Sequence, residues 1–254
     1  MSNPFANLAY EADKAVEKDV LFTGNGPLES DIYLFDINYM YLSTSKSSKA
    51  QAVNIEVTTA EGKRHRESIW ITNKDGKNKA AKQGSNQEEY LQGFLLANSI
   101  CLLACGKPLT QVVVETKTIN LYNFDQKKEV PTDVQMITST LKRPIKLAIQ
   151  KSRKNKQKKN TQSGVYENVN EEKFESSIVK AFRADSNKTE AEIRAQSDAK
   201  FHDEWLAANK GKTIDRYKEV TGNGNAGAPQ GNFAGGSGFN PSEPAAGDDP
   251  FAMQ

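Results

Sequence analysis

Aromatic and cationic side chains occur together in the first third of the sequence, a combination that could hold an unpaired nucleic-acid strand. Tyr39, Tyr41 and Trp70 offer flat rings on which unpaired bases stack, at roughly 1–3 kcal/mol per base. The cations that could follow the phosphates of such a strand flank Trp70: Arg64, Arg66, Lys74, Lys77, Lys79 and Lys82. The competing interpretation places the rings in a hydrophobic core, and it is the favoured one for Tyr33 and Phe35.

Charge is segregated along the chain, although the formal net charge is only +2. No Asp or Glu occurs between residues 134 and 166, and the cations of this window are Lys142, Arg143, Lys146, Lys151, Arg153, Lys154, Lys156, Lys158 and Lys159. A basic block of this kind predicts a polyanionic partner. We therefore add the cations from Lys142 to Lys154 to the predicted DNA-binding residues, with a solvated basic linker as the alternative for 151–159.

The segment 221–254 has the opposite charge. It lacks Lys and Arg, carries three acidic residues and is rich in Gly, Asn, Ala and Pro. Because such a composition cannot bury enough apolar surface to offset its ordering entropy, it predicts a flexible tail. Asp248, Asp249, Pro250 and Phe251 form an acidic–aromatic peptide that a partner protein could bind, and a plain linker is the alternative. A tethered acidic tail could also compete with a polyanion for the basic block.

Catalytic and metal-binding sites are not predicted. The sequence has no Walker-type phosphate loop, no Gly-x-Ser-x-Gly and no Gly-x-Gly-x-x-Gly after a strand. Its acids are scattered, whereas two-metal chemistry needs them clustered. His65 and His202 are the chain's two histidines, and both are predicted to be surface residues. We therefore expect no enzyme activity, no cofactor and no metal.

Cys101 and Cys105 lie four residues apart in an apolar helical pattern, which predicts small core side chains rather than ligands. No apolar run approaches the roughly 18 residues that cross a bilayer. Residues 1–5 lack the basic and apolar regions of a secretory signal. We expect a reducing cytoplasm and no membrane partner.

Alternation of apolar and polar residues predicts an antiparallel meander of strands at 31–42, 51–59 and 67–72. The first strand would place its alternate rings and aliphatic side chains on one side: Tyr33, Phe35, Ile37, Tyr39 and Tyr41. In the third strand, Trp70 would face away from its two isoleucine neighbours. A capping-box pattern at 85–88 then predicts an apolar helix that ends near Gly106 and plugs the sheet.

Later elements complete a β-rich α+β fold. Strands are predicted at 111–114, 119–124, 134–138 and 145–150, and helices at 171–182 and 189–211, with a last turn or two within 214–220. This order suits an OB-like antiparallel barrel with an inserted helix, followed by a helical appendage and a disordered tail. The corresponding domains are an arm at 1–26, a core with a basic extension at 27–160, the appendage at 161–220 and the tail at 221–254.

The chain resembles bacteriophage single-stranded DNA-binding proteins, which have an OB-fold core and an acidic C-terminal tail. The resemblance covers roughly 27–150 and the tail. It rests on the long aromatic first strand and on four later segments: Val53-Asn54-Ile55-Glu56-Val57, Ser68-Ile69-Trp70-Ile71-Thr72, Leu102-Leu103-Ala104-Cys105-Gly106 and Asp248-Asp249-Pro250-Phe251. The tail departs from the bacterial pattern in two respects. It has fewer acids, and Ala252-Met253-Gln254 follow the Phe that ends that pattern.

This resemblance implies a protein that coats single-stranded DNA without sequence preference during phage DNA replication, recombination and repair, in the cytoplasm of the bacterial host. It also implies that the tail recruits replication proteins such as a polymerase, helicase or primase, and that the chain could form a homo-oligomer. Two other classes stay open: a structural or assembly adaptor that touches nucleic acid, and an RNA-binding module, because OB barrels serve both polymers.

Overall fold

The computed structural model describes residues 26–82, 87–123, 126–161 and 164–220. The acidic tail, with Asp248, Asp249, Pro250 and Phe251, and nearly all of the predicted N-terminal arm lie outside the described residues. The described part is a β-rich α+β fold, in which eight strands belong to one sheet and two short strands form another. The predicted fold class is confirmed at this level.

The predicted meander forms one end of the large sheet. It consists of β1 (Asp31–Thr44), β2 (Gln51–Thr58) and β3 (Arg64–Trp70), each antiparallel to its neighbour, with β3 as the terminal strand of the order. Every residue of β2 from Ala52 to Val57 is buried, because other side chains cover both faces of this strand. The predicted strands are therefore confirmed, with β3 beginning three residues earlier than expected.

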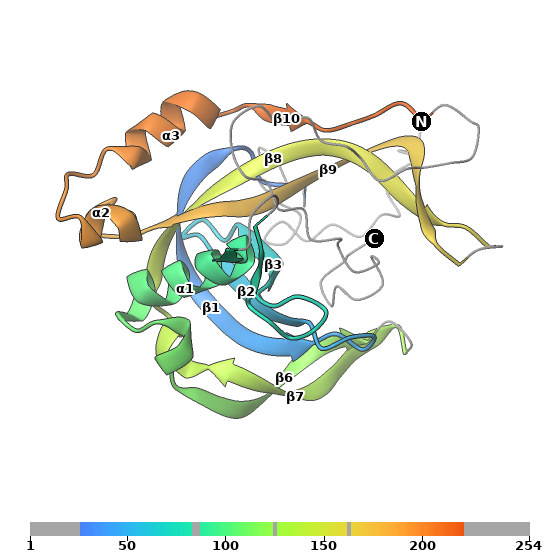
Figure 1. The fold of residues 1–254 in the computed structure, drawn as a ribbon, viewed down its shortest axis with the longest axis horizontal. Coiled ribbons are helices and arrows are strands. Elements are labelled where there is room, and N and C mark those ends of the chain that lie inside the picture. Colours follow the sequence, from blue (N-terminus) through green and yellow to red (C-terminus); the bar gives the residue numbers. More distant parts are fainter. Residues whose placement is uncertain (1–25, 83–86, 124–125, 162–163, 221–254) are drawn as a thin grey trace, which may run out of the picture.

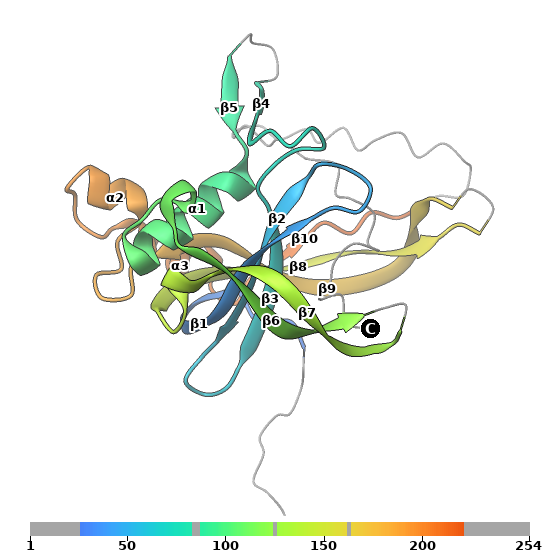
Figure 2. The same cartoon turned by 90° about the horizontal axis from the view of Figure 1, so that it is seen from below.

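Two long hairpins continue the sheet from β1. β8 (Pro144–Lys159) pairs with the first half of β1 and with β9 (Tyr166–Phe182), whereas β7 (Lys128–Ile137) pairs with the second half of β1 and with β6 (Val114–Asn123). Figures 1 and 2 show both hairpins extending in the same direction beyond the meander, with β8–β9 above and β6–β7 below in Figure 1. Single-turn 3-10 helices at Leu109–Gln111 and Thr138–Thr140 lead into β6 and follow β7.

A bulge in β1 changes which side chains share a face. The pairing of β1 with β2 shifts between Ile37 and Tyr39, so that one extra residue reverses the inside–outside alternation. Phe35 and Ile37 lie in the main core, whereas Tyr41 belongs to a separate cluster on the other side of the sheet. The prediction that alternate residues from 33 to 41 share one side is therefore wrong after residue 37.

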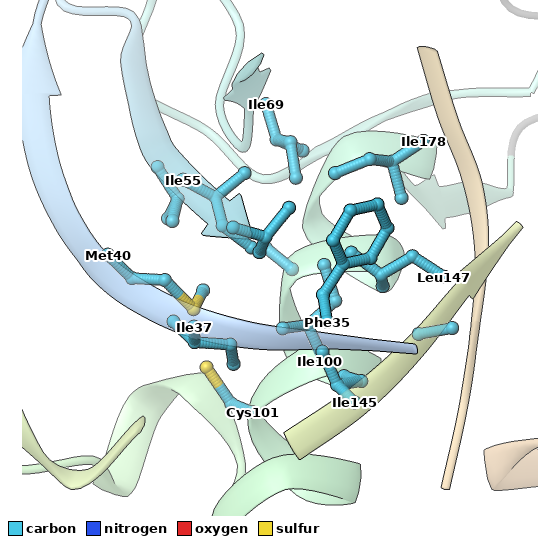
Figure 3. Packing of buried hydrophobic residues seen from close by; sticks show 14 of the residues in the cluster. Phe35, Ile37, Met40, Ile55, Ile69, Ile100, Cys101, Ile145, Leu147 and Ile178 are labelled. Carbon is cyan, nitrogen blue, oxygen red and sulfur yellow. The ribbon is translucent and has the colours of Figure 1, made fainter. Parts of the chain in front are cut away.

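The helix α1 (Gln92–Cys105) closes the main core, as predicted. Its residues Ala97, Ile100 and Cys101 are fully buried, and Figure 3 shows Ile100 and Cys101 among side chains of the meander and β8. Burial raises the pKa of the Cys101 thiol to about 12, as expected for a core side chain rather than a reactive one. The helix ends at Gly106, whose φ of 73° lets its N–H bond to the Leu102 carbonyl.

The start of α1 differs from the prediction. The residues expected to form its first turn include β5 (Glu88–Tyr90), which pairs with β4 (Lys79–Ala81) in a short hairpin. Figure 2 shows this hairpin projecting away from the large sheet. The helix then begins without a side-chain cap, after Leu91.

The helix predicted at 171–182 is wrong, because this segment is the second half of β9. Its apolar residues Phe174, Ile178 and Phe182 are four apart, a spacing that gives one face of a strand as well as one face of a helix. A bulge beside Ile178 then separates them, since Ile178 lies in the main core and Phe182 packs with Trp205 on the other side.

The final described segment is helical only in part. The predicted capping box of Thr189 and Glu192 is confirmed, but the expected helix at 189–211 is split into α2 (Glu190–Arg194) and α3 (Phe201–Asn209). After α3 the chain forms β10 (Thr213–Asp215), which pairs in parallel with the part of β8 that extends beyond β1. The last described residues are thus strand and coil rather than the expected helical turns.

Candidate nucleic-acid interface

The side chains of the meander that point away from α1 form one surface, which we call the polar face. Strand alternation and pairing place on it the following residues: Tyr39, Tyr41 and Ser43 of β1, Asn54, Glu56 and Thr58 of β2, and Arg64, Arg66, Ser68 and Trp70 of β3. The opposite face of the same strands carries the isoleucines and valines of the main core. The sheet thus gathers Tyr39, Trp70, Arg64 and Arg66, four of the predicted binding residues, on one surface.

Glu56 occupies the middle of the polar face and is only 4% exposed. Its carboxylate accepts hydrogen bonds from Tyr39 Oη and Asn38 Nδ2, both at 2.8 Å, and from Arg66 Nε. Arg64 Nε lies 3.7 Å from the same carboxylate. Two predicted cations and one predicted ring are therefore held by a single buried acid.

The protonation of this group is set by its partners. Burial disfavours the carboxylate, but the hydrogen bonds from Tyr39, Asn38 and Arg66 outweigh it and hold the pKa of Glu56 below its usual range. Burial and the bond to Glu56 raise the pKa of Tyr39. Glu56 is therefore a carboxylate and Tyr39 a neutral donor at neutral pH.

A second group of side chains fixes the surface next to Glu56. The Asn54 side chain donates to Ser43 Oγ at 2.7 Å and accepts from Ser68 Oγ at 2.6 Å, so its amide is held in one orientation across three strands. Tyr41 lies beside it but is 1% exposed, packed by Val134 and Met136 of β7. The Tyr41 ring is therefore covered by β7 and is not exposed for stacking on a base.

Trp70 lies at the end of the polar face and is half-buried. Its ring faces away from Ile69 and Ile71, both of which are buried in the main core, as predicted. Its backbone carbonyl supports the first turn of α1 at Gly93. The position of this ring is consequently tied to the packing of α1 on β3.

Lysines surround the end of the meander beyond Trp70. The predicted residues Lys74 and Lys77 are exposed there, and the N–H of Lys49 donates to the Lys74 carbonyl at 3.0 Å. Lys46 is also exposed in the turn between β1 and β2. Sequence reasoning missed Lys46 and Lys49, although the pairing of two predicted strands would have brought their turn beside the loop after Trp70.

Lys79 and Lys82 are placed elsewhere. Both belong to the β4–β5 hairpin or its turn, and Lys79 Nζ lies 4.6 Å from the centre of the Tyr90 ring. That ring stacks in turn on Phe94 at the start of α1, with their centres 5.2 Å apart. Lys79 is thus engaged with its own hairpin, and Lys82 is exposed at its end.

The basic block on β8 is not free of acids in space. Arg153 pairs with Glu172 at 2.5 Å and with Asp215 at 2.9 Å, and Lys154 pairs with Glu175 at 2.5 Å. The other pairs are Lys151 with Glu29, and Lys156 and Lys158 with Glu171. Strand β9 and two neighbouring segments therefore supply the negative charges that the 134–166 window lacks.

The remaining predicted cations lie near the start of β8. Lys142 and Arg143 are exposed in the turn before β8, and their backbone groups bond to those of Ile37. Lys146 Nζ donates to Asn187 Oδ1 at 2.5 Å, in the turn after β9. These contacts do not bring the three side chains to the polar face.

A pocket of about 240 Å³ lies at the end of the core between α1 and the start of β6. Its walls are mostly apolar and include Leu42, Ile71, Phe94 and Val112, together with Gln51 and Asn78. None of the predicted binding residues lines it. His65 is buried beside Glu67 rather than solvated, with Nε2 and Oε2 3.2 Å apart.

Within residues 26–82, 87–123, 126–161 and 164–220, His, Cys, Asp and Glu side chains form no group of three that could hold a metal ion. The helices in the same ranges are all too short or too polar to cross a membrane. No protein-family model, no curated protein and no solved structure matches this chain.

Proposed function

We propose that the chain binds single-stranded DNA on the polar face, without sequence preference, and coats it during phage DNA replication, recombination and repair. The observation that carries the proposal is the gathering of Tyr39, Trp70, Arg64 and Arg66 on one surface of the meander. Such surfaces bind single strands because rings and guanidinium groups stack on any base, whatever its sequence. Lys49, Lys74 and Lys77 at the end of the face would bind phosphates.

An OB-like barrel is the finer fold that we propose for this surface. The path β3–β2–β1–β8–β9 is antiparallel at each step, so β3 and β9 run in the same direction. The Ile178 N–H of β9 donates to the Glu67 carboxylate of β3 at 2.6 Å, which supports an approach of the two ends of this path. In OB-folds the second and third strands carry the oligonucleotide, in agreement with a site on β2 and β3.

The segment after Val220 would recruit replication proteins through Asp248, Asp249, Pro250 and Phe251. Its point of attachment supports a second role as a competitor for DNA. The Lys218 N–H donates to Asn155 of β8 at 2.9 Å, and the Val220 N–H donates to Asn170 of β9 at 2.7 Å. The acids that follow are thereby tethered to the hairpin that carries most of the basic block.

Tryptophan fluorescence tests the proposal, because the two tryptophans differ in their position. Trp70 belongs to the polar face, whereas Trp205 is 8% exposed between α3 and the sheet. Oligothymidylate should quench the wild type and a Trp205→Phe variant, and it should leave a Trp70→Phe variant almost unchanged. Raising the salt concentration should weaken binding steeply, since phosphate contacts release counterions.

Three ligands distinguish the alternatives. Binding of oligothymidylate, with little binding of duplex DNA of the same length, supports the proposal. Equal binding of oligouridylate would identify a general single-strand binder that also accepts RNA. A wild type that responds only to duplex DNA, or quenching that disappears with Trp205 and not with Trp70, would contradict binding on the polar face.

A further inference from the structure

The floor of the polar face carries a negative charge directly beneath its two arginines. Glu56 is buried and accepts hydrogen bonds from Arg66, Tyr39 and Asn38, while Arg64 lies 3.7 Å away. A buried carboxylate costs folding free energy unless its partners compensate for lost hydration, and here they do. The same charge also acts on an incoming ligand, because a carboxylate under a binding surface repels phosphate.

We infer, on the basis of the proposed function, that Glu56 is a selectivity residue: it makes the polar face accept the flat faces of nucleobases and directs phosphate groups to the lysines at the end of the face. Glu56 acts through Arg64, Arg66 and Tyr39, which it positions. The ligand class of the face is therefore the uncharged base, and the phosphate path lies along Lys49, Lys74 and Lys77.

The charges on the face agree with this division. Two guanidinium groups and one carboxylate leave a net charge of +1, and both arginines form an ion pair with Glu56. Guanidinium groups are weakly hydrated and planar, so they stack on bases while their edges donate to a carboxylate. The side chain of Arg64 is 59% exposed and that of Arg66 31% exposed, which leaves surface for such contact.

The lysines at the end of the face have a different environment. Lys49, Lys74 and Lys77 are exposed on neighbouring turns, and no ion pair joins them to a carboxylate of the described residues. Ammonium groups without a fixed partner bind phosphates as point charges and release counterions when they do. The two kinds of cation should therefore respond differently to salt.

The first test changes the charge of Glu56 and keeps its shape. Glu56→Gln should bind an abasic deoxyribose–phosphate strand about threefold tighter than the wild type, with a salt slope steeper by about 0.7 for each phosphate gained. The preference of the wild type for oligothymidylate over the abasic strand should fall accordingly. Glu190→Gln, which makes the same charge change in a surface i,i+4 pair with Arg194 on α2, is the control and should leave this preference unchanged.

The second test does not require a variant of the buried group, and it decides the inference if Glu56→Gln does not fold. Arg64→Gln should weaken oligothymidylate binding about tenfold through lost stacking, with an unchanged salt slope. Lys74→Gln should weaken binding and reduce the slope by about 0.7. Equal loss of slope in both variants, or an unchanged preference in folded Glu56→Gln, would overturn the role of Glu56.

These outcomes are separate from a failure of the proposed function. A wild type that binds the abasic strand as tightly as oligothymidylate would exclude base stacking, and with it the proposed binding of bases on the polar face. A wild type that prefers oligothymidylate, combined with a preference that Glu56→Gln retains, would reject only the selectivity role.

Discussion

Gly93 is the residue on which the contact between α1 and β3 depends. A Cβ atom at this position would lie 2.0 Å from the Trp70 carbonyl oxygen and 2.9 Å from its carbonyl carbon. Because both are backbone atoms, a larger residue must displace the helix or the strand. Gly93→Ala should lower the free energy of unfolding by about 1–3 kcal/mol, the usual cost of overpacking. Urea unfolding would measure this loss.

The same substitution should also change the environment of Trp70, whose fluorescence reports the shift directly. Gly26→Ala is the control, since a Cβ there would meet no atom within 4 Å. Equal stability of Gly93→Ala and the wild type would show that α1 lies farther from β3 than described. Trp70 would then owe its position to other contacts.

Glu192 links the start of α2 to the start of α3. Burial opposes its charged form, but bonds from the backbone N–H groups of Phe201, Thr189 and Lys200 outweigh it and lower the pKa from 4.5 to about 2. A carboxylate with a lowered pKa stabilises the folded state above its unfolded pKa, and this contribution is lost as the pH falls through the folded value. The stabilisation by Glu192 should therefore be complete above about pH 4.5 and absent below about pH 2.

Urea midpoints of the wild type and Glu192→Gln as a function of pH would measure this effect. The wild type should be the more stable protein near neutral pH, and the difference should shrink between pH 4.5 and about 2. Glu190→Gln removes a charge from the same helix and controls for net charge. A difference that stays constant with pH would exclude the Glu192 carboxylate as its source.

At the scale of the elements, one side chain of β3 forms a hydrogen bond to the backbone of β9. Glu67 accepts the Ile178 N–H at 2.6 Å, next to the bulge of β9, and His65 lies 3.2 Å away. Glu67→Ala should lower stability by about 1–3 kcal/mol, because it leaves a buried donor unsatisfied. Glu67→Gln keeps an acceptor oxygen and should lose much less.

Amide hydrogen exchange makes the prediction specific to this contact. Protection of the Ile178 N–H should fall in Glu67→Ala and be largely retained in Glu67→Gln, whereas amides in α3 should be unaffected. Similar protection of Ile178 in both variants would mean that Glu67 does not hold β9.

Elements whose sequence pattern fits only one type of secondary structure were predicted correctly. The alternation in β2 and the Gly106 stop of α1 are examples, since each has a direct local cause. The wrong predictions come from patterns that fit both a helix and a strand, or from a single extra residue in a strand. In β9, apolar residues that lie four positions apart fit a helix and a strand equally well. In β1, the composition gives no sign of the bulge after Ile37.

The candidate site shows the same limit. Arg64 and Arg66 were predicted only as cations that flank Trp70, because the predicted strand began at residue 67; their shared face follows from the start of β3 at Arg64. Glu56 could not be recognised as their partner without the register of β2 against β3. The burial of Tyr41 depends on β7, which is far away in the sequence.

At the scale of the whole molecule, folding rearranges the charge pattern that dominates the sequence. The basic strand β8 lies against an acidic strand, so cations that follow one another without acids in the chain are paired across the hairpin. On the proposed function, DNA would have to displace the acids of β9 from these cations, in addition to any competition from residues 221–254. The effect of the β9 acids on DNA affinity can be measured separately from that of residues 221–254, because the two sets of acids belong to different segments.

The triple variant Glu171→Gln, Glu172→Gln, Glu175→Gln removes the competitor on β9. It frees Arg153, Lys154, Lys156 and Lys158 from their partners on that strand, so affinity for oligothymidylate at low salt should rise about tenfold and the salt slope should steepen. A variant with Glu190→Gln, Asp203→Asn and Glu204→Gln has the same change in net charge on α2 and α3, and it should bind more weakly than the β9 variant.

If both variants gain equally, net charge alone explains the increase, and DNA does not reach β8. A larger gain in the β9 variant would instead extend the DNA path from the polar face onto the β8–β9 hairpin, where the tail is attached.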